Sequence, residues 1–208
     1  KRGMHHADAF NANPSFRVAG ICDIDQAKLT AAAPKLGDPE IGTDAREMAL
    51  ALKPDVFCFC TLPSLRLDLI RIGVECGARL IAFEKPIAMT SQEGLEVKKA
   101  LETRPVKAVV SHQHRYGVHY QKVKEIVASG ALGRVHTVYG TATGWMAHML
   151  SHLIDYTCWF NDYEEAEWAM AQAAGRGKME DLHTSPDYLA GVVHFKNGVR
   201  GIYDCGAG

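Results

Sequence analysis

Short apolar runs alternate with amphipathic stretches through the first half of the chain. The apolar runs predict strands, most of them buried on both faces, at residues 16–22, 55–60, 80–83 and 106–110. The amphipathic stretches carry apolar residues at helical spacing and predict helices at residues 26–36, 43–52, 64–76 and 91–101, with Ser91 as the cap of the last one. Strand and helix alternating in this way predict right-handed βαβ units around a parallel sheet. Such sheets bind ligands at the carboxyl ends of their strands, so we expect functional residues directly after the apolar runs.

The second half of the chain has a different pattern. Helices are predicted at residues 118–129 and 147–160. Strands are predicted at residues 135–143, 167–174, 188–195 and 199–205. The pair Asn197-Gly198 between the last two strands is a strong hairpin-turn signal. A parallel half followed by a mostly antiparallel half predicts an α/β protein of two domains that meet near residues 112–117.

Composition then narrows the functional classes. Of the 208 residues, 47% are hydrophobic and 23% are charged, and the formal net charge is −1. That balance excludes a nucleic-acid binder that relies on bulk positive charge. No apolar run approaches the ~18 residues of a membrane-spanning helix, so we expect neither a nucleic acid nor a membrane as partner. The six cysteines are scattered without a C-x-x-C pair. Cys58 and Cys60 would share one face of a strand as reduced thiols. Reduced cysteines of this kind favour a cytoplasmic location for the protein.

An acidic residue follows the first apolar run. Asp23 comes directly after Cys22, where the acid of a dinucleotide fold hydrogen-bonds the adenosine ribose and, by repelling a 2′-phosphate, favours NAD over NADP. Gly3 lies 20 residues upstream, about where the last glycine of a G-x-G-x-x-G turn belongs. The competing interpretation is that Asp23 only forms a turn, which is the commoner role of an Asp after a strand.

The tripeptide Glu84-Lys85-Pro86 follows the strand predicted at residues 80–83. A lysine at the carboxyl edge of a sheet can donate a hydrogen bond to a reacting hydroxyl or carbonyl and polarise it for hydride transfer. A solvated charged loop is the alternative interpretation of the same residues.

Four segments together resemble the Gfo/Idh/MocA oxidoreductases, the relatives of glucose–fructose oxidoreductase and inositol dehydrogenase. They are Thr61-Leu62-Pro63, Glu84-Lys85-Pro86, residues 129–135 and residues 151–155, which lie in the family's order. The resemblance implies a Rossmann dinucleotide-binding domain at residues 1–113 and a partial substrate and oligomerisation domain at residues 114–208, with an open, mostly antiparallel sheet. It also implies truncation at both ends of a chain of about 330–400 residues, with the first strand and two glycines of the phosphate loop missing.

The resemblance assigns roles to individual residues. Cofactor-binding positions are Gly3, Asp23, Thr61, Leu62, Pro63, Glu84, Lys85, Gln113 and Arg66, the last replacing a His or Asn of the family. Arg115 and Tyr116 align with an Arg-aromatic pair at the substrate pocket. His152 aligns with the family's acid/base histidine, which acts together with Lys85.

One departure from the family pattern affects the catalytic site. The family commonly has Asp four residues before its histidine, and this chain has His148. A second imidazole cannot stabilise an imidazolium as a carboxylate does, so either the proton chemistry falls more on Lys85 or His148 itself binds substrate. His148 and His152 share a helix face, but the sequence has neither the Glu of the zincin pattern nor a third ligand at a spacing that requires a metal. We therefore predict no metal site. His5 and His6 are expected to be exposed.

The resemblance implies an NAD-dependent oxidoreductase that transfers a hydride between nicotinamide and a secondary hydroxyl of a sugar, polyol or sugar derivative. Two other functions stay open: an NAD-dependent glycoside hydrolase that oxidises its sugar transiently, and a non-catalytic NAD-sensing regulator. NADP is the less favoured cofactor. We also expect a homo-oligomer, a dimer or a tetramer, because an open sheet leaves a face that needs covering.

Overall fold

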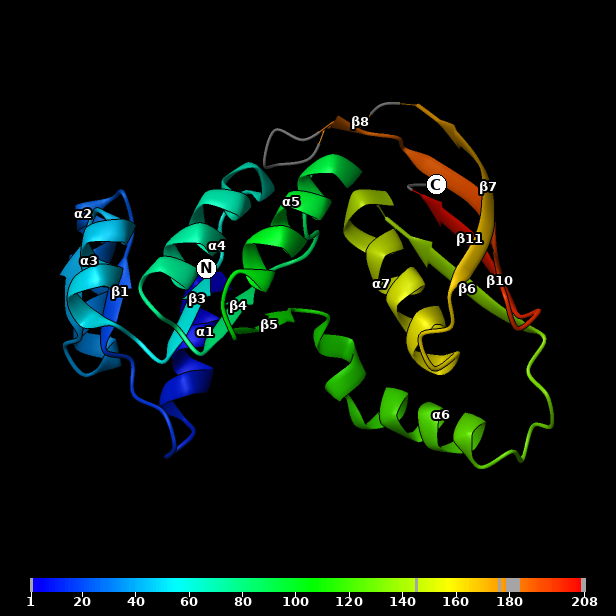
Figure 1. Ribbon diagram of the computed structural model, residues 1–208, viewed down its shortest axis with the longest axis horizontal. Helices are drawn as coiled ribbons and strands as arrows, with labels where there is room; N and C mark the ends of the chain where they lie inside the picture. The colour runs from blue at the N-terminus through cyan, green and yellow to red at the C-terminus, as the bar shows by residue number, and fades with distance from the viewer. Residues whose placement is uncertain (1, 145, 176, 179–183, 207–208) are drawn as a thin grey trace. The chain divides into compact units, whose positions relative to one another are not determined.

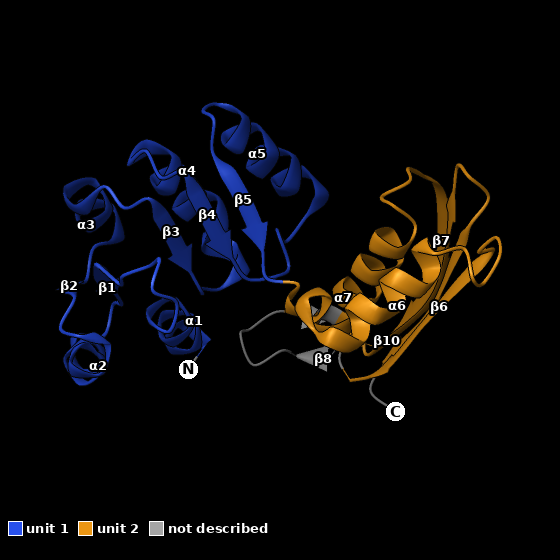
Figure 2. Ribbon diagram, turned by 90° about the horizontal axis from the view of Figure 1, so that it is seen from below, with its two compact units in different colours: residues 1–111 blue, residues 112–208 orange. Residues whose placement is uncertain are grey.

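The computed structural model describes residues 2–144, 146–175, 177–178 and 184–206. The chain divides into two compact units, residues 1–111 and residues 112–208 (Figure 2). The first unit holds the predicted βαβ pattern, and the second holds the predicted antiparallel pattern.

The first unit alternates helices and short parallel strands along the chain (Figure 1). Its elements in chain order are α1 (Arg2–Asn11), β1 (Gly20–Cys22), α2 (Gln26–Ala32), η1 (Ala33–Leu36), β2 (Glu40–Gly42), α3 (Ala45–Leu52), β3 (Val56–Phe59), η2 (Pro63–Leu65), α4 (Arg66–Glu75), β4 (Leu80–Phe83), α5 (Ser91–Glu102) and β5 (Lys107–Val110). Strand β1 pairs in parallel with β2, and β3, β4 and β5 form a separate parallel sheet in that order.

Side-chain caps fix where several of these helices begin. Asp25 accepts hydrogen bonds from the backbone N–H groups of Ala27 and Lys28, and Asp44 accepts one from Glu47. Thr90 caps α5, so the predicted cap at Ser91 is wrong by one residue. The strand predicted at 16–22 is shorter, and β2 was not predicted because three residues carry too little pattern.

The core of the first unit lies between the three-stranded sheet and the helices α4 and α5. Phe59, Ile81 and Phe83 point to that face, and Ile81 is fully buried. The rings of Phe59 and Phe83 stack with centroids 5.5 Å apart. Gly73 on α4 is needed for this packing, because a Cβ there would lie 2.9 Å from Ile81 Cδ1.

The second unit packs helices against a mixed four-stranded sheet. Its elements in chain order are η3 (Gln113–Tyr116), α6 (Val118–Ala128), β6 (Thr137–Thr143), α7 (Met146–Phe160), β7 (Ala166–Ala174), β8 (Gly177–Lys178), β9 (Thr184–Ser185), β10 (Tyr188–Phe195) and β11 (Arg200–Gly206). The sheet order is β6-β11-β10-β7, with β6 and β11 parallel and the other two pairings antiparallel. Helix α7 covers one face, where Leu153 packs against Tyr203 and Cys205. No helix among the described residues is long and apolar enough to span a membrane.

The opposite face of that sheet carries large exposed side chains. Tyr139 on β6 is 72% exposed, and Met170 and Trp168 on β7 are 68% and 48% exposed. Tyr188 on β10 is also exposed, and Trp168 stacks on His194 in the neighbouring strand. The alternation along β7 and β10 turns these residues away from α7, so they form one apolar surface, which we call the outer sheet face.

Candidate functional site

The candidate residues of the first unit stand where strands end, as the sequence predicts. Asp23 follows β1, Cys60 and Thr61 follow β3, and Glu84 and Lys85 follow β4. Because β3 and β4 run parallel with Phe59 opposite Phe83, the next residues along the two strands, Cys60 and Glu84, lie side by side. The sheet therefore sets the spacing of this part of the site.

Asp23 forms a turn and still faces solvent. Its Oδ1 accepts a hydrogen bond from the N–H of Asp25 at 3.0 Å, and its side chain is 41% exposed. Lys28 Nζ lies 4.0 Å from the same oxygen. Gly3 lies in the first turn of α1, and a Cβ built on it would meet no protein atom within 4 Å. Packing within the described chain does not require a glycine at this position.

A hydrogen bond joins the segment after β3 to the loop after β4. Leu62 is exposed, whereas Pro63 is buried and begins η2. Arg66 is only 2% exposed, and its Nη2 donates to the backbone carbonyl of Lys85 at 3.2 Å. This contact, which the sequence did not predict, joins the helix that follows β3 to the loop after β4.

Glu84 contacts the first helix of the chain. Its carboxylate is 14% exposed, and Oε1 lies 3.0 Å from Nε2 of His6 and 3.8 Å from Nε of Arg2. The expectation of an exposed His6 is therefore wrong, because helix α1 turns this ring toward the sheet edge. The peptide bond between Lys85 and Pro86 is cis.

Two thiols, Cys58 on β3 and Cys60 directly after it, interact beside this edge. A hydrogen bond from Cys58 lowers the pKa of the Cys60 thiol to about 7, against the effect of burial, and the electrostatic interaction with His6 acts in the same direction. The same hydrogen bond, together with burial, raises the pKa of Cys58. Both side chains lie on the face opposite Phe59, as the alternation of a strand predicts.

The second unit gathers a cluster of rings around His152. His152 is 4% exposed, and its ring stacks on His114 with centroids 4.7 Å apart and meets His112 edge-on at 5.3 Å. The hydroxyl of Tyr156 hydrogen-bonds Nδ1 of His114, and Tyr120 stacks on Tyr156. Burial raises the pKa of Tyr156, and its hydrogen bond with Tyr120 adds to that shift. We call these five residues the ring cluster.

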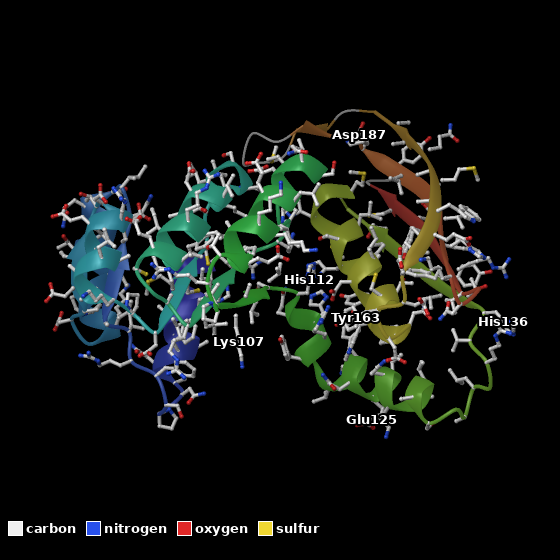
Figure 3. All side chains as sticks on the ribbon, in the orientation of Figure 1. Lys107, His112, Glu125, His136, Tyr163 and Asp187 are labelled. Atoms are coloured by element: carbon white, nitrogen blue, oxygen red, sulfur yellow. The ribbon has the colours of Figure 1, made fainter. Side chains whose placement is uncertain are left out.

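A carboxylate lies next to the ring cluster. Arg115 pairs with Asp155 through two hydrogen bonds, from Nε to Oδ2 at 3.1 Å and from Nη2 to Oδ1. Nδ1 of His112 lies 3.6 Å from Oδ1 of the same aspartate. Arg115 also donates to the hydroxyl of Tyr163 at 2.5 Å. Figure 3 shows His112 where the second unit begins and Tyr163 beyond the end of α7.

Three other predicted site residues of the second unit are exposed. Gln113 and His148 are exposed, and Tyr116 is 69% exposed although its neighbour Arg115 is largely buried in the ion pair. His148 is therefore exposed and His152 is buried, although both lie on one face of α7. The contacts of His6, Asp155 and Tyr156 were not predicted, because their partners are 40 to 78 residues away along the chain.

Comparison with known proteins identifies the family. The family model of the Gfo/Idh/MocA oxidoreductases, described as an oxidoreductase family with an NAD-binding Rossmann fold, matches residues 1–112. This match covers more than half of the chain, so the protein belongs to that family. The α/β fold predicted from the sequence is confirmed, with a Rossmann first unit and a second unit built on a mixed sheet.

Individual relatives are more distant. The chain is 26% identical over 137 residues to D-glucoside 3-dehydrogenase of Escherichia coli, covering 66% of this chain and 39% of that protein. It is 27% identical over 135 residues to the NADP(+) scyllo-inositol 2-dehydrogenase of Bacillus subtilis, covering 55% and 37%. The scyllo-inositol dehydrogenase structure of Lactobacillus casei superposes with a TM-score of 0.83 at 17% identity, over 100% of this chain and 68% of that one. The matches thus span about two-fifths of the curated relatives.

Proposed function

We propose that the protein is an NAD-dependent oxidoreductase that transfers a hydride between nicotinamide and a secondary hydroxyl of a sugar, polyol or sugar derivative. The observation that carries this proposal is the loop Glu84-Lys85-Pro86 at the carboxyl end of β4 in a unit that matches an NAD-binding family. Related proteins bear the names of a glucoside dehydrogenase and an inositol dehydrogenase, which supports the substrate class.

The donor set of the first unit fits a dinucleotide. Asp23 offers a part-exposed carboxylate after β1 for the adenosine ribose, and the N-terminal turn of α1 with Gly3 suits a pyrophosphate. Thr61, Leu62 and Pro63 would pass beneath the cofactor, and Glu84 and Gln113 would lie toward the nicotinamide, whose ring accepts or donates the hydride when bound. The carboxylate of Asp23 would repel a 2′-phosphate, so NAD is preferred over NADP.

The proton chemistry would fall to Lys85 and His152. Lys85 donates a hydrogen bond to the reacting oxygen, and a ring nitrogen of His152 takes up the hydroxyl proton during oxidation. The family's aspartate is replaced by His148, but the carboxylate of Asp155 lies 3.6 Å from His112, whose ring meets that of His152. Because the carboxylate of Asp155 is already paired with Arg115 through two hydrogen bonds, more of the proton chemistry would fall to Lys85. Arg115 and Tyr116 would bind substrate, with His148 at the exposed end.

Replacement of Lys85 tests this proposal. We expect Lys85→Ala to lower turnover by on the order of 10²–10⁴-fold while NAD affinity, measured by calorimetry, changes little. The matched control is Lys98→Ala, because Lys98 is 71% exposed on α5 and pairs only with Glu102 among the described contacts. A Lys85→Ala variant with near wild-type rates on polyols and glycosides would disprove the assignment.

The replacement at residue 148 supports a second candidate function. An enzyme that oxidises its sugar transiently, eliminates the glycosidic substituent and returns the hydride needs a different proton network from a simple dehydrogenase, and His148 alters that network. Chromogenic glycosides with NAD distinguish the two functions. Aglycone release without net NADH supports the hydrolase, whereas NADH accumulation without aglycone supports the dehydrogenase. NAD binding without turnover of either substrate class would support the regulatory alternative.

The outer sheet face supports a homo-oligomer. Tyr139, Trp168 and Met170 expose a large apolar surface on β6 and β7 that association with a second copy would bury. Light scattering on the purified protein checks this expectation, and a monomer at all concentrations would contradict it.

A further inference from the structure

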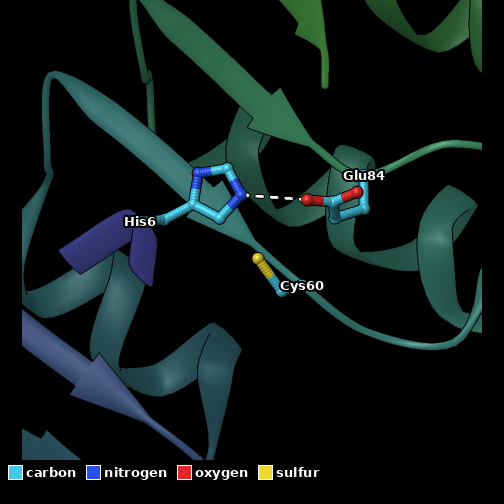
Figure 4. Close-up of side chains that lie close together, drawn as sticks. All are labelled: His6, Cys60 and Glu84. Carbon is cyan, nitrogen blue, oxygen red and sulfur yellow. Dashed lines mark hydrogen bonds and ion pairs between the residues drawn. The ribbon is translucent and has the colours of Figure 1, made fainter. Parts of the chain in front are cut away.

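Three side chains with metal-binding atoms converge at the carboxyl edge of the first sheet. His6 comes from α1, Cys60 follows β3 and Glu84 follows β4, and one ligand atom of each lies within 4.8 Å of the other two (Figure 4). Among the described residues, this is the only such group of three or more His, Cys, Asp and Glu side chains. All three residues belong to the first unit, and the two strands that precede Cys60 and Glu84 are paired neighbours.

The main chain places two of the three ligands. Phe59 and Phe83 are register partners that stack on the α4–α5 side of the sheet, so the following residues, Cys60 and Glu84, turn to the opposite side. His6 reaches them from α1, with Nε2 3.0 Å from Oε1 of Glu84. Three atoms bound tetrahedrally to one ion at about 2.0–2.3 Å lie about 3.5 Å apart. Small side-chain rotations would bring this group to that spacing.

The environment suits a cation. The side chains of His6 and Glu84 are 29% and 14% exposed, so the group is sheltered but open to entry. Arg2 is the other cation near Glu84 among the described contacts, at 3.8 Å, and its side chain is 58% exposed and can turn into solvent. An ion would replace Arg2 as the counter-charge of the glutamate.

We propose that His6, Cys60 and Glu84 form a binding site for a divalent cation of the zinc type. A set of one imidazole, one thiolate and one carboxylate selects Zn²⁺ over Mg²⁺ or Ca²⁺, because sulfur is a poor ligand for the harder ions. Three protein ligands leave a fourth position for water or another ligand. Binding would release the thiol proton of Cys60 to solvent and form the metal–sulfur bond, with no change of oxidation state. The site does not depend on the proposed function, because metal binding can be measured without nucleotide or sugar.

Cobalt(II) and zinc titrations test the site on the reduced protein without nucleotide or sugar. We expect one equivalent of Co²⁺ to produce a thiolate-to-cobalt charge-transfer band, and equimolar Zn²⁺ to remove it. Cys60→Ser should abolish the band and weaken Zn²⁺ affinity about tenfold or more, and Glu84→Gln and His6→Ala should weaken it similarly. The matched control is Cys22→Ser, because Cys22 is an exposed thiol at the end of the parallel strand β1 and lies outside the group.

The outcomes separate a site from incidental binding. Circular dichroism first verifies that each variant is folded, and the conservative Cys60→Ser change is the decisive one. Equal Zn²⁺ affinity in wild type and Cys60→Ser, or cobalt binding without a thiolate band, overturns the proposal. A band that survives Cys60→Ser but is lost in Cys58→Ser also overturns it, because the ligand would then be the thiol on β3 and not Cys60.

Discussion

The two units hold their candidate residues by different means. In the first unit, Glu84 and Cys60 are placed by the register of two parallel strands, and the backbone carbonyl of Lys85 is held by the buried Arg66. In the second unit, His152 is placed by side chains: rings stack on it, and Asp155 ties Arg115 and His112 to the same helix. A site built on main-chain geometry should tolerate the loss of one side chain better than a site built on side-chain contacts.

The largest difference should follow removal of the aspartate in the second unit. Asp155→Ala leaves the largely buried guanidinium of Arg115 without its carboxylate, which costs about 3 kcal/mol of the free energy of unfolding. Urea denaturation followed by circular dichroism measures the loss. Asp155→Asn keeps an oxygen acceptor and should recover part of it.

A surface carboxylate provides the matched control for that change. Glu125 on α6 also pairs with a basic residue, Lys122, but its side chain is 65% exposed. Glu125→Ala should therefore cost less than about 0.5 kcal/mol. If the two alanine variants lost the same stability, burial of the Asp155–Arg115 pair would not be what stabilises this part of the second unit.

This difference explains how much could be predicted from the sequence. Periodicity located most strands of both units but not β2, β8 or β9, and the rule that ligands bind at strand ends located Glu84 and Lys85. The pairing of Arg115 with Asp155 spans 40 residues and depends on how η3 meets α7, which no local pattern encodes. The contact of His6 with Glu84 spans 78 residues and depends on the direction of α1. Main-chain placement was therefore predictable, and side-chain placement was not.

A smaller effect is expected for a cap in the first unit. Thr90 Oγ1 accepts from the N–H of Glu93 at 3.2 Å, and Glu93 accepts in return from the N–H of Met89 at 2.8 Å, so the start of α5 has a reciprocal cap. Thr90→Ala should lower the free energy of unfolding by about 1 kcal/mol, measured by the same denaturation.

A threonine inside a helix is the control for that cap. Thr30 Oγ1 donates to the carbonyl of Gln26 within α2 and caps nothing. Thr30→Ala should leave stability unchanged or slightly raised, because alanine favours helix more than threonine does. A loss at Thr30 equal to the loss at Thr90 would show that the measured cost is not that of the cap.

The smallest effect concerns the pH dependence of the ring cluster. The pKa of Tyr156 is raised in the folded state, chiefly by burial. Below the unfolded value of about 10 both states keep the hydroxyl proton, and Tyr156 adds no pH dependence. Above pH 10 the unfolded state loses its proton first, so stability falls as the pH rises.

The ring of Tyr156 is partly exposed, so the slope should be well below the limit of about 1.4 kcal/mol per pH unit. Tyr156→Phe should flatten the stability curve between pH 9 and about pH 11, with Tyr116→Phe as the control at an exposed ring. If Tyr156→Phe and wild type lose stability in parallel over that range, burial in the ring cluster does not govern this hydroxyl.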